Sequence, residues 1–237
     1  MVVTKYKLKK NIHSPLRFAL LTDFHDGECG EVIRMLENEN ADAFLVCGDF
    51  IHNSHRFQNG ISLLEKLSKQ RPTFCSLGNH ETLFDGDIRQ MVRDSGAVLL
   101  ESSFSEFRGV KLGGLSSGFM YGCNDGTRFN TPKPDVEWLN SFAAESGTKI
   151  LMSHHPEYYA QYIKATKIDL TVSGHAHGGQ WRFFGQGIFA PGQGFFPKYT
   201  AGVHEDRLII SRGLGNPHPV PRLNNKTELV MIEIFPQ

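Results

Sequence analysis

The sequence predicts an α/β fold, and two patterns support that prediction. Apolar runs of strand length alternate along the chain with segments whose apolar residues recur at helical spacing. The strand-like runs are almost wholly apolar, which is typical of strands that are covered on both faces. Each run is followed at once by polar residues that can bind a metal. Because ligand sites of open α/β sheets lie at the carboxyl ends of strands, the functional site is expected there.

Length and composition narrow the class of protein. A chain of 237 residues with 40% hydrophobic content is the size of one α/β core, so a single domain over residues 1–237 is expected. Lys plus Arg and Asp plus Glu both number 25, so no long-range attraction to nucleic acid is predicted. The apolar stretch 18–21 is too short for a signal peptide or a membrane span, and no membrane anchor is predicted.

The cysteines indicate a cytoplasmic location. They are widely spaced and form no CxxC pair, which argues against a zinc ribbon or a dense disulfide framework. Their positions are Cys29, Cys47, Cys75 and Cys123. A reduced, intracellular setting follows. The basic residues near the N-terminus are interpreted as a solvated strand edge.

The elements follow one another in a regular order. The strands that precede polar motifs are expected at residues 17–22, 43–47, 73–77, 149–153 and 170–173. The helices between them are expected at residues 31–38, 61–69, 86–94, 135–145 and 157–164. Further strand-like runs, at 97–100, 110–115, 208–211 and 228–234, could supply a second sheet. The Gly- and aromatic-rich region 178–215 is expected to form ordered loops, with core packing of its aromatics preferred over an apolar binding groove.

Two pairs of residues, each with its members two positions apart, point most clearly to a metal site. The first of these strands ends in LLTDFHDG, so Asp23 and His25 would point to the same side of an extended chain. The fifth ends in VSGHAHGG, where His175 and His177 repeat this spacing and the flanking glycines let the backbone approach an ion. Asp23 and His25 are therefore expected to grip one ion, and His175 and His177 are expected to lie close to an ion.

The remaining strands end in VCGDF, SLGNHE and LMSHHP and complete a ligand set. The predicted metal ligands are Asp23, His25, Asp49, Asn79, His154, His175 and His177. Carboxylate, imidazole and amide donors without thiolate suit Mn, Fe, Zn or Ni better than Ca or Mg. The set is large enough for two divalent ions, with Mn as the first expectation. Two ions about 3.5–4 Å apart can clamp a phosphoryl group and lower the pKa of a bound water.

Some neighbouring side chains have two interpretations. His154 and His155 are adjacent, so their side chains diverge and one of them can ligate; His154 is preferred. For the loop histidines and cations, a solvated surface position is preferred over a role in phosphate binding. The sequence leaves open whether substrate is contacted by His155, His52, His55, Arg182, Lys198 or His204.

The motifs DFH, GDF, GNHE, SHHP and GHAHGGQ, in this order, resemble the calcineurin-like metallophosphoesterase superfamily. The resemblance runs from about residue 17 to the end. GHAHGGQ and the later SRGLGNP are similar to a small bacterial branch that includes membrane-associated phosphodiesterases and a diphosphatase of lipid-linked sugar nucleotides. The resemblance implies a four-layer α/β/β/α sandwich of two mixed sheets flanked by helices.

The resemblance also implies a role for each residue. The ligands implied for the first ion are Asp23, His25 and His177, and those for the second are Asn79, His154 and His175. Asp49 would bridge the ions, Asn79 would help hold the phosphate, and His80 would protonate the leaving oxygen. The implied reaction is hydrolysis of a small phosphorylated substrate, a phosphodiester first, by a hydroxide shared between the metals.

Other functions stay open at this point. A phosphomonoester or a nucleotide-sugar diphosphate would suit the same ligands, and so would a membrane lipid substrate. A non-catalytic binding module on the same fold would be expected to lack some ligands or the imidazole acid, and all of these positions are filled. No oligomeric state is predicted.

Overall fold

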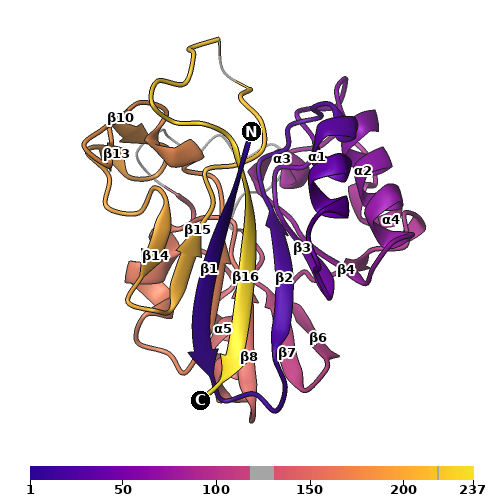
Figure 1. The fold of residues 1–237 in the computed structure, drawn as a ribbon, viewed down its shortest axis with the longest axis vertical. Helices are drawn as coiled ribbons and strands as arrows, with labels where there is room; N and C mark the ends of the chain where they lie inside the picture. The colour runs from indigo at the N-terminus through magenta and orange to yellow at the C-terminus, as the bar shows by residue number, and fades with distance from the viewer. Residues whose placement is uncertain (118–130, 218) are drawn as a thin grey trace.

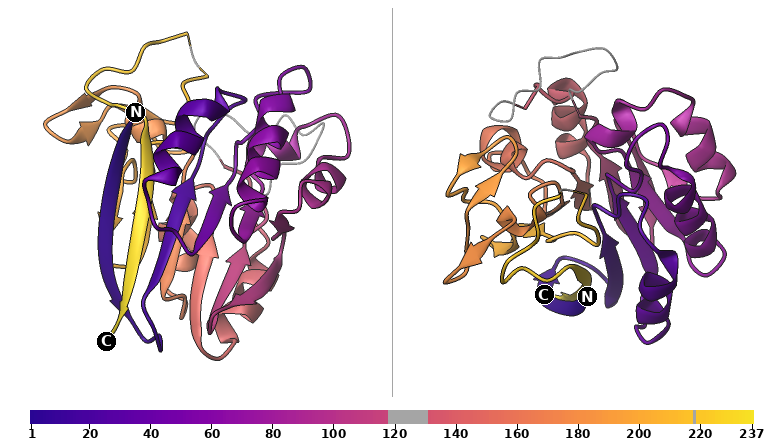
Figure 2. Two further views of the ribbon diagram at one scale, coloured as in Figure 1. Left: turned by 45° about the vertical axis from the view of Figure 1, so that its right-hand side comes forward. Right: turned by 90° about the horizontal axis from the view of Figure 1, so that it is seen from above.

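Two mixed β-sheets pack face to face, with helices on both outer surfaces (Figures 1 and 2). The computed structural model describes residues 1–117, 131–217 and 219–237. The strand order is β1-β16-β2-β3-β4-β5 in the first sheet and β14-β15-β9-β8-β7-β6 in the second. The layers are the four that the resemblance implies.

The first sheet carries the N-terminal half of the ligand motifs. Its strands are β1 (Val2–Lys10), β16 (Glu228–Pro236), β2 (Leu16–Leu21), β3 (Ala43–Cys47), β4 (Thr73–Ser76) and β5 (Val98–Leu99). Only β16 and β2 pair antiparallel among these neighbours. β1 lies at the sheet edge with Lys5 and Lys7 exposed, as the sequence predicts.

The second sheet carries the C-terminal half of the motifs. Its strands are β14 (Gly202–His204), β15 (Leu208–Ile210), β9 (Leu170–Ser173), β8 (Thr148–Met152), β7 (Val110–Gly114) and β6 (Ser103–Phe107). The runs at 97–100 and 228–234 were expected to supply this sheet, which is wrong. β5 instead pairs with β4, and β16 lies between β1 and β2 in the first sheet.

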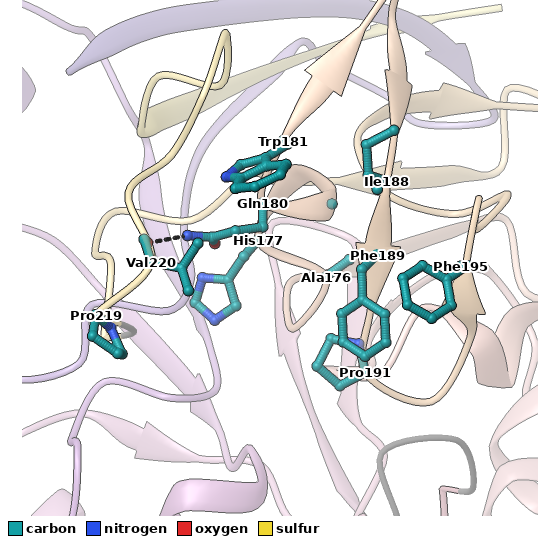
Figure 3. A pocket seen from close by; sticks show the side chains of 11 residues that line it. Ala176, His177, Gln180, Trp181, Ile188, Phe189, Pro191, Phe195, Pro219 and Val220 are labelled. Atoms are coloured by element: carbon teal, nitrogen blue, oxygen red, sulfur yellow. Dashed lines mark hydrogen bonds between the residues drawn. The ribbon is translucent and has the colours of Figure 1, made fainter.

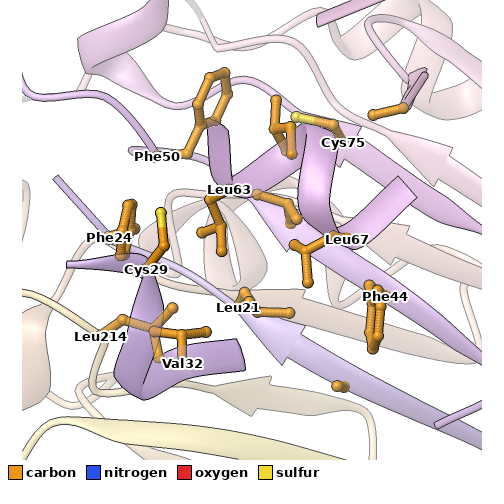
Figure 4. Packing of buried hydrophobic residues seen from close by; sticks show 14 of the residues in the cluster. Leu21, Phe24, Cys29, Val32, Phe44, Phe50, Leu63, Leu67, Cys75 and Leu214 are labelled. Carbon is orange, nitrogen blue, oxygen red and sulfur yellow. The ribbon is translucent and has the colours of Figure 1, made fainter. Parts of the chain in front are cut away.

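The inner strands β16, β2, β3 and β4 of the first sheet are largely buried on both faces because their alternate side chains serve two cores. Phe18 and Leu20 of β2 face the second sheet, whereas Ala19 and Leu21 belong to the core under the helices. The helices over that core are α1 (Cys29–Glu37), α2 (Gln58–Ser68) and α4 (Ile88–Asp94). Figure 4 shows Leu21 packed among residues of these helices.

The outer face of the second sheet has its own apolar cluster. It is covered by α5 (Val136–Ala144) and by η1 (Tyr159–Ile163), through Leu139, Phe142 and Tyr159. The helix expected at 157–164 is a π-helical turn, in which the Lys164 N–H donates to the Tyr159 carbonyl at 2.7 Å.

The loops after β2, β3, β4, β8 and β9 meet at one end of the sandwich. They include α3 (Asn79–Thr82) and η2 (His177–Gly179). The region 178–215 continues from η2 into two short hairpins before β14 and β15, so the prediction of ordered loops is confirmed. The hairpin strands are β10 (Arg182–Phe183), β11 (Gln186–Gly187), β12 (Phe189–Ala190) and β13 (Gly194–Phe195).

Two further sequence expectations concern cysteines and membrane spans. Cys29, Cys47 and Cys75 are buried free thiols, and Cys123 lies outside the described residues. Within the described ranges, no helix combines the length and the apolar character that crossing a membrane requires.

Candidate metal centre

Asp49 lies at the centre of the converging side chains. It follows β3 with a φ of 54°, and its backbone N–H donates to Glu81 Oε2 at 2.7 Å. Its Oδ1 accepts the backbone N–H of His80 at 3.0 Å. Its Oδ2 lies 3.1 Å from His154 Nε2 and 3.9 Å from Nε2 of both His25 and His80. One carboxylate therefore faces three imidazoles.

Asp23, His25 and His177 form a first buried ligand cluster. The Nε2 atoms of His25 and His177 lie 3.2 Å apart, and His177 Nε2 is 3.6 Å from Asp23 Oδ1. Two ring nitrogens that face each other beside a carboxylate suit a shared cation. Asp23 and His25 have φ of 51° and 50°, so the expected extended backbone is wrong. The left-handed turns, and not strand alternation, bring these side chains together.

Asp49, His154 and His175 form the second cluster, and all three are buried. His154 Nδ1 donates to the Cys47 carbonyl at 2.9 Å, which turns Nε2 toward Asp49. Asn79 Oδ1 is buried and has no hydrogen-bond partner among the described residues. A buried amide oxygen without a donor is destabilising unless a cation binds it, so Asn79 fits the expected ligand role.

The adjacent histidines diverge, as the sequence predicts. His154 faces Asp49, whereas His155 Nε2 lies 3.1 Å from Ser117 Oγ and His155 Nδ1 lies 3.7 Å from Glu157 Oε1. The His155 ring also packs against the ring of His175, with 4.3 Å between centroids. His155 therefore packs against the candidate ligand His175 and does not face Asp49.

Without metal, the site holds one strong ion pair. Burial alone would raise the pKa of Asp49, but the surrounding imidazoles, His154 first, hold that pKa well below its usual range. Burial lowers the pKa of His154, yet the charge of Asp49 outweighs it and raises the pKa to about 10. Burial lowers the pKa of His175 to about 3 and that of His25 well below its usual value. His154 is thus held protonated, whereas His25 and His175 are held neutral.

His80 lies at the rim of the site. Its side chain is 27% exposed, against 1% for His154, so a substrate can reach it. Its Nδ1–H donates to the His52 carbonyl, which leaves Nε2 pointing toward Asp49. Burial opposes protonation of His80, but the nearby Asp49 outweighs burial and raises its pKa. An imidazole with these properties can act as a general acid near neutral pH.

The structure separates the side chains whose roles the sequence left open. His52 lies near the site, with its ring centroid 5.5 Å from that of His80. His55 is exposed and its backbone N–H bonds to Asn53. The three remaining candidates make contacts elsewhere. Arg182 donates to Gly178 and Thr200, Lys198 lies over the Tyr199 ring, and His204 bonds to the Ala201 carbonyl.

Two residues that support the site were missed by sequence reasoning. Glu81 accepts backbone N–H bonds from Asp49, Ile51 and Gly78 at 2.7, 3.0 and 2.8 Å, which ties two ligand loops together. Its position three residues after Gly78 is a capping spacing that could have indicated this role. Arg222 donates to His177 Nδ1 at 3.1 Å. No motif in the surrounding sequence signals Arg222.

A largely apolar cavity of about 510 Å³ opens beside His177 (Figure 3). Its walls include Trp181, Ile188, Phe189 and Phe195. The preference for core packing of the region's aromatics is wrong for Trp181 and Phe195, which are 42% and 68% exposed. The hairpins that carry them are too short to be covered by another layer, so these rings face the cavity or solvent.

Comparisons with known proteins identify the family of this chain. The metallophosphoesterase Cj0846 of Campylobacter jejuni is 26% identical over 94% of this chain and 60% of its own length. The phosphodiesterase YaeI of Escherichia coli is 22% identical over 95% of this chain and 84% of its own. The NAD nucleotidase structure from Haemophilus influenzae aligns with a TM-score of 0.49 at 14% identity, over 70% of this chain and 39% of that one. The family model for calcineurin-like phosphoesterases matches residues 16–179, which include every candidate ligand, and this chain belongs to that family.

Proposed function

We propose that this chain hydrolyses phosphate esters, phosphodiesters first, with two divalent ions at the candidate metal centre. The observation that supports this most strongly is the convergence of two buried clusters on Asp49, with Asn79 Oδ1 buried beside them and without a partner among the described residues. A buried carboxylate that faces three imidazoles is costly in an apolar core. The same donors are well suited to bind a divalent cation.

The donors divide into two sets. The first ion would be held by Asp23, His25 and His177, the second by Asn79, His154 and His175, with Asp49 shared between them. Mixed oxygen and nitrogen donors favour Mn, Fe, Zn or Ni, and Mn is proposed first. When bound, two such ions supply an activated water and neutralise charge that develops on the phosphoryl oxygens.

The chain's own residues would then position and protonate the substrate. Asn79 and the exposed edge of His80 lie where a phosphoryl group can approach the cluster. His80, held by the His52 carbonyl, would give the proton from Nε2 to the departing oxygen. No covalent phosphoenzyme is required. The name of YaeI, a phosphodiesterase, favours a diester over a monoester.

The test is hydrolysis of bis-p-nitrophenyl phosphate and p-nitrophenyl phosphate by metal-stripped protein. Mn²⁺, Fe²⁺, Zn²⁺, Ni²⁺ and Mg²⁺ are added back separately, and bound metal is counted in parallel. We expect turnover that depends on added metal, faster for the diester, with two ions per chain. Activity that survives complete metal removal would overturn the proposal, and faster monoester turnover would overturn the diester preference.

A cytoplasmic location is part of the same proposal. It is supported by the three described cysteines, which are free and buried and so are not used as disulfides.

A further inference from the structure

The two hairpins beside the metal centre carry exposed aromatic side chains. We call Trp181, Phe184, Phe195 and Phe196 the aromatic patch. Phe184 is fully exposed, and Phe195 and Phe196 are 68% and 70% exposed. Large apolar side chains that gather on the surface mark a contact with a partner or a membrane.

Two phenylalanines of the patch stand on an unusual backbone, Phe184 in the turn between β10 and β11 and Phe196 directly after β13. Phe184 has a φ of 50° and Phe196 a φ of 51°, which is the left-handed region. Bulky side chains rarely adopt this conformation, whereas glycine or asparagine adopts it at little cost. At both positions, a phenylalanine therefore occurs where the local backbone favours another residue. Such outliers point to a function for the side chain.

The aromatic patch is held in place before anything binds it. Ile188 joins the two hairpins, because its N–H donates to the Trp181 carbonyl at 2.9 Å and its carbonyl accepts the Phe196 N–H at 2.8 Å. Trp181 Nε1 donates to the Pro221 carbonyl at 2.9 Å, and Gln180 Nε2 to the Val220 carbonyl at 2.6 Å. These bonds attach the hairpins to the loop before β16, and the two segments lie together at one end of the molecule (Figure 1). A preformed patch loses little conformational entropy on binding.

The two segments that carry the aromatic patch and the loop before β16 have cationic and no acidic residues; Glu205 and Asp206 lie between these segments, in the turn between β14 and β15, and the Glu157 carboxyl beside Gly192 is buried. Residues 174–204 and 207–227 contain no Asp or Glu, although the chain has 25 acidic residues. Lys198 and Lys226 are exposed within these two segments. Aromatic rings together with lysines, and without carboxylates, suit the headgroup region of an anionic bilayer. A neutral chain would thus present a basic, aromatic face.

We propose that the aromatic patch docks this protein on anionic lipid bilayers, with the Phe184 and Phe196 rings inserted at the headgroup level. Phe195 belongs both to the patch and to the cavity wall beside His177, so docking places the metal centre next to the membrane surface (Figure 3). The proposal concerns location and does not depend on the phosphoesterase activity.

The test is sedimentation of the metal-loaded full chain with sucrose-filled vesicles. Vesicles of phosphatidylcholine alone are compared with vesicles that contain phosphatidylglycerol. We expect binding that increases with the anionic lipid and falls with salt. Phe184→Ser and Phe196→Ser should each lower the partition coefficient about tenfold, because each removes one buried phenyl ring. Lys198→Glu should weaken binding to the anionic vesicles only.

Matched controls lie on other surfaces. Phe104→Ser changes a phenylalanine that is 40% exposed on β6, and Lys9→Glu reverses an exposed charge on β1; neither should change binding. The melting temperatures of the Phe184 and Phe196 variants, followed by circular dichroism, should equal that of the unmodified chain, which shows that they fold.

Three outcomes would overturn the proposal. The first is no sedimentation with either vesicle, and the second is sedimentation that the two phenylalanine variants leave unchanged. The third is a dimer in sedimentation velocity that the same variants dissociate, which would make the patch an interface between two copies. Each of these is separate from the metal-activity test, so a failure of docking leaves the proposed chemistry intact.

Discussion

Replacing Glu81 by Gln should destabilise the fold without removing any proposed ligand. Burial and the charge of Asp49 raise the pKa of Glu81 to about 7, so the carboxylate is ionised at pH 8. There it accepts three backbone N–H bonds, from Asp49, Ile51 and Gly78. A glutamine side chain offers one oxygen to these donors and turns an NH₂ group toward the rest.

The expected magnitude follows from that count. At least one buried N–H loses its acceptor, which costs about 1–3 kcal/mol, and the bonds that remain lose their charge assistance. A total near 3 kcal/mol would lower the melting temperature by about 6–12 °C in a chain of this size. Because two of the N–H groups belong to the loops that hold Asp49 and Asn79, metal affinity should fall as well.

The measurement is thermal unfolding of metal-stripped protein at pH 8, followed by circular dichroism, together with metal titration by calorimetry. Glu101→Gln is the matched control, because Glu101 is bound to Arg89 on the surface and should contribute less than about 1 kcal/mol. A melting temperature of Glu81→Gln within about 2 °C of the unmodified chain would show that this carboxylate does not hold the two loops.

Three further predictions concern the metal centre. His80→Ala should keep both metals and lower turnover of the diester by about 10²–10⁴-fold, because the rim imidazole supplies a proton and no ligand; normal turnover would refute the general-acid role. Asp49→Ala should lose metal, since this carboxylate faces both clusters, and two metals per chain by elemental analysis would contradict the bridging role. Metal binding at pH 7.5 should release about one proton from His154, whose pKa of about 10 keeps it charged in the metal-free site. Affinity should therefore rise with pH below that value, and calorimetry in buffers of different ionisation enthalpy would detect the proton; equal heats in all buffers would exclude it.

Much of the ligand set could be read from sequence because each candidate directly follows an apolar run. Asp49 and His154 are examples, because the carboxyl ends of parallel strands lie close together for any conformation of the loops that follow them. Asp23 and His25 were predicted to lie close together on the assumption of an extended backbone, which is wrong. Their left-handed backbone conformation also brings the two side chains together. Their function as ligands stays a prediction, as does the single domain.

The supporting contacts could not be predicted in the same way. Arg222 reaches His177 from a loop 45 positions away in sequence, and no local pattern encodes such a pairing. The exposure of Phe184 and Phe196 was also missed, because apolar composition predicts burial and does not reveal that a hairpin is too short to be covered.

Each candidate ion cluster draws donors from both sheets. Asp23 and His25 follow β2 of the first sheet, whereas His177 follows β9 of the second. Asp49 follows β3, and His154 follows β8 across the interface. The distances between the ligands are thus set by how the two sheets stack on each other. Core residues such as Phe18 and Leu45, which are not themselves candidate ligands, determine that stacking. Overpacking between the sheets would therefore shift the ligands relative to one another without replacing any of them.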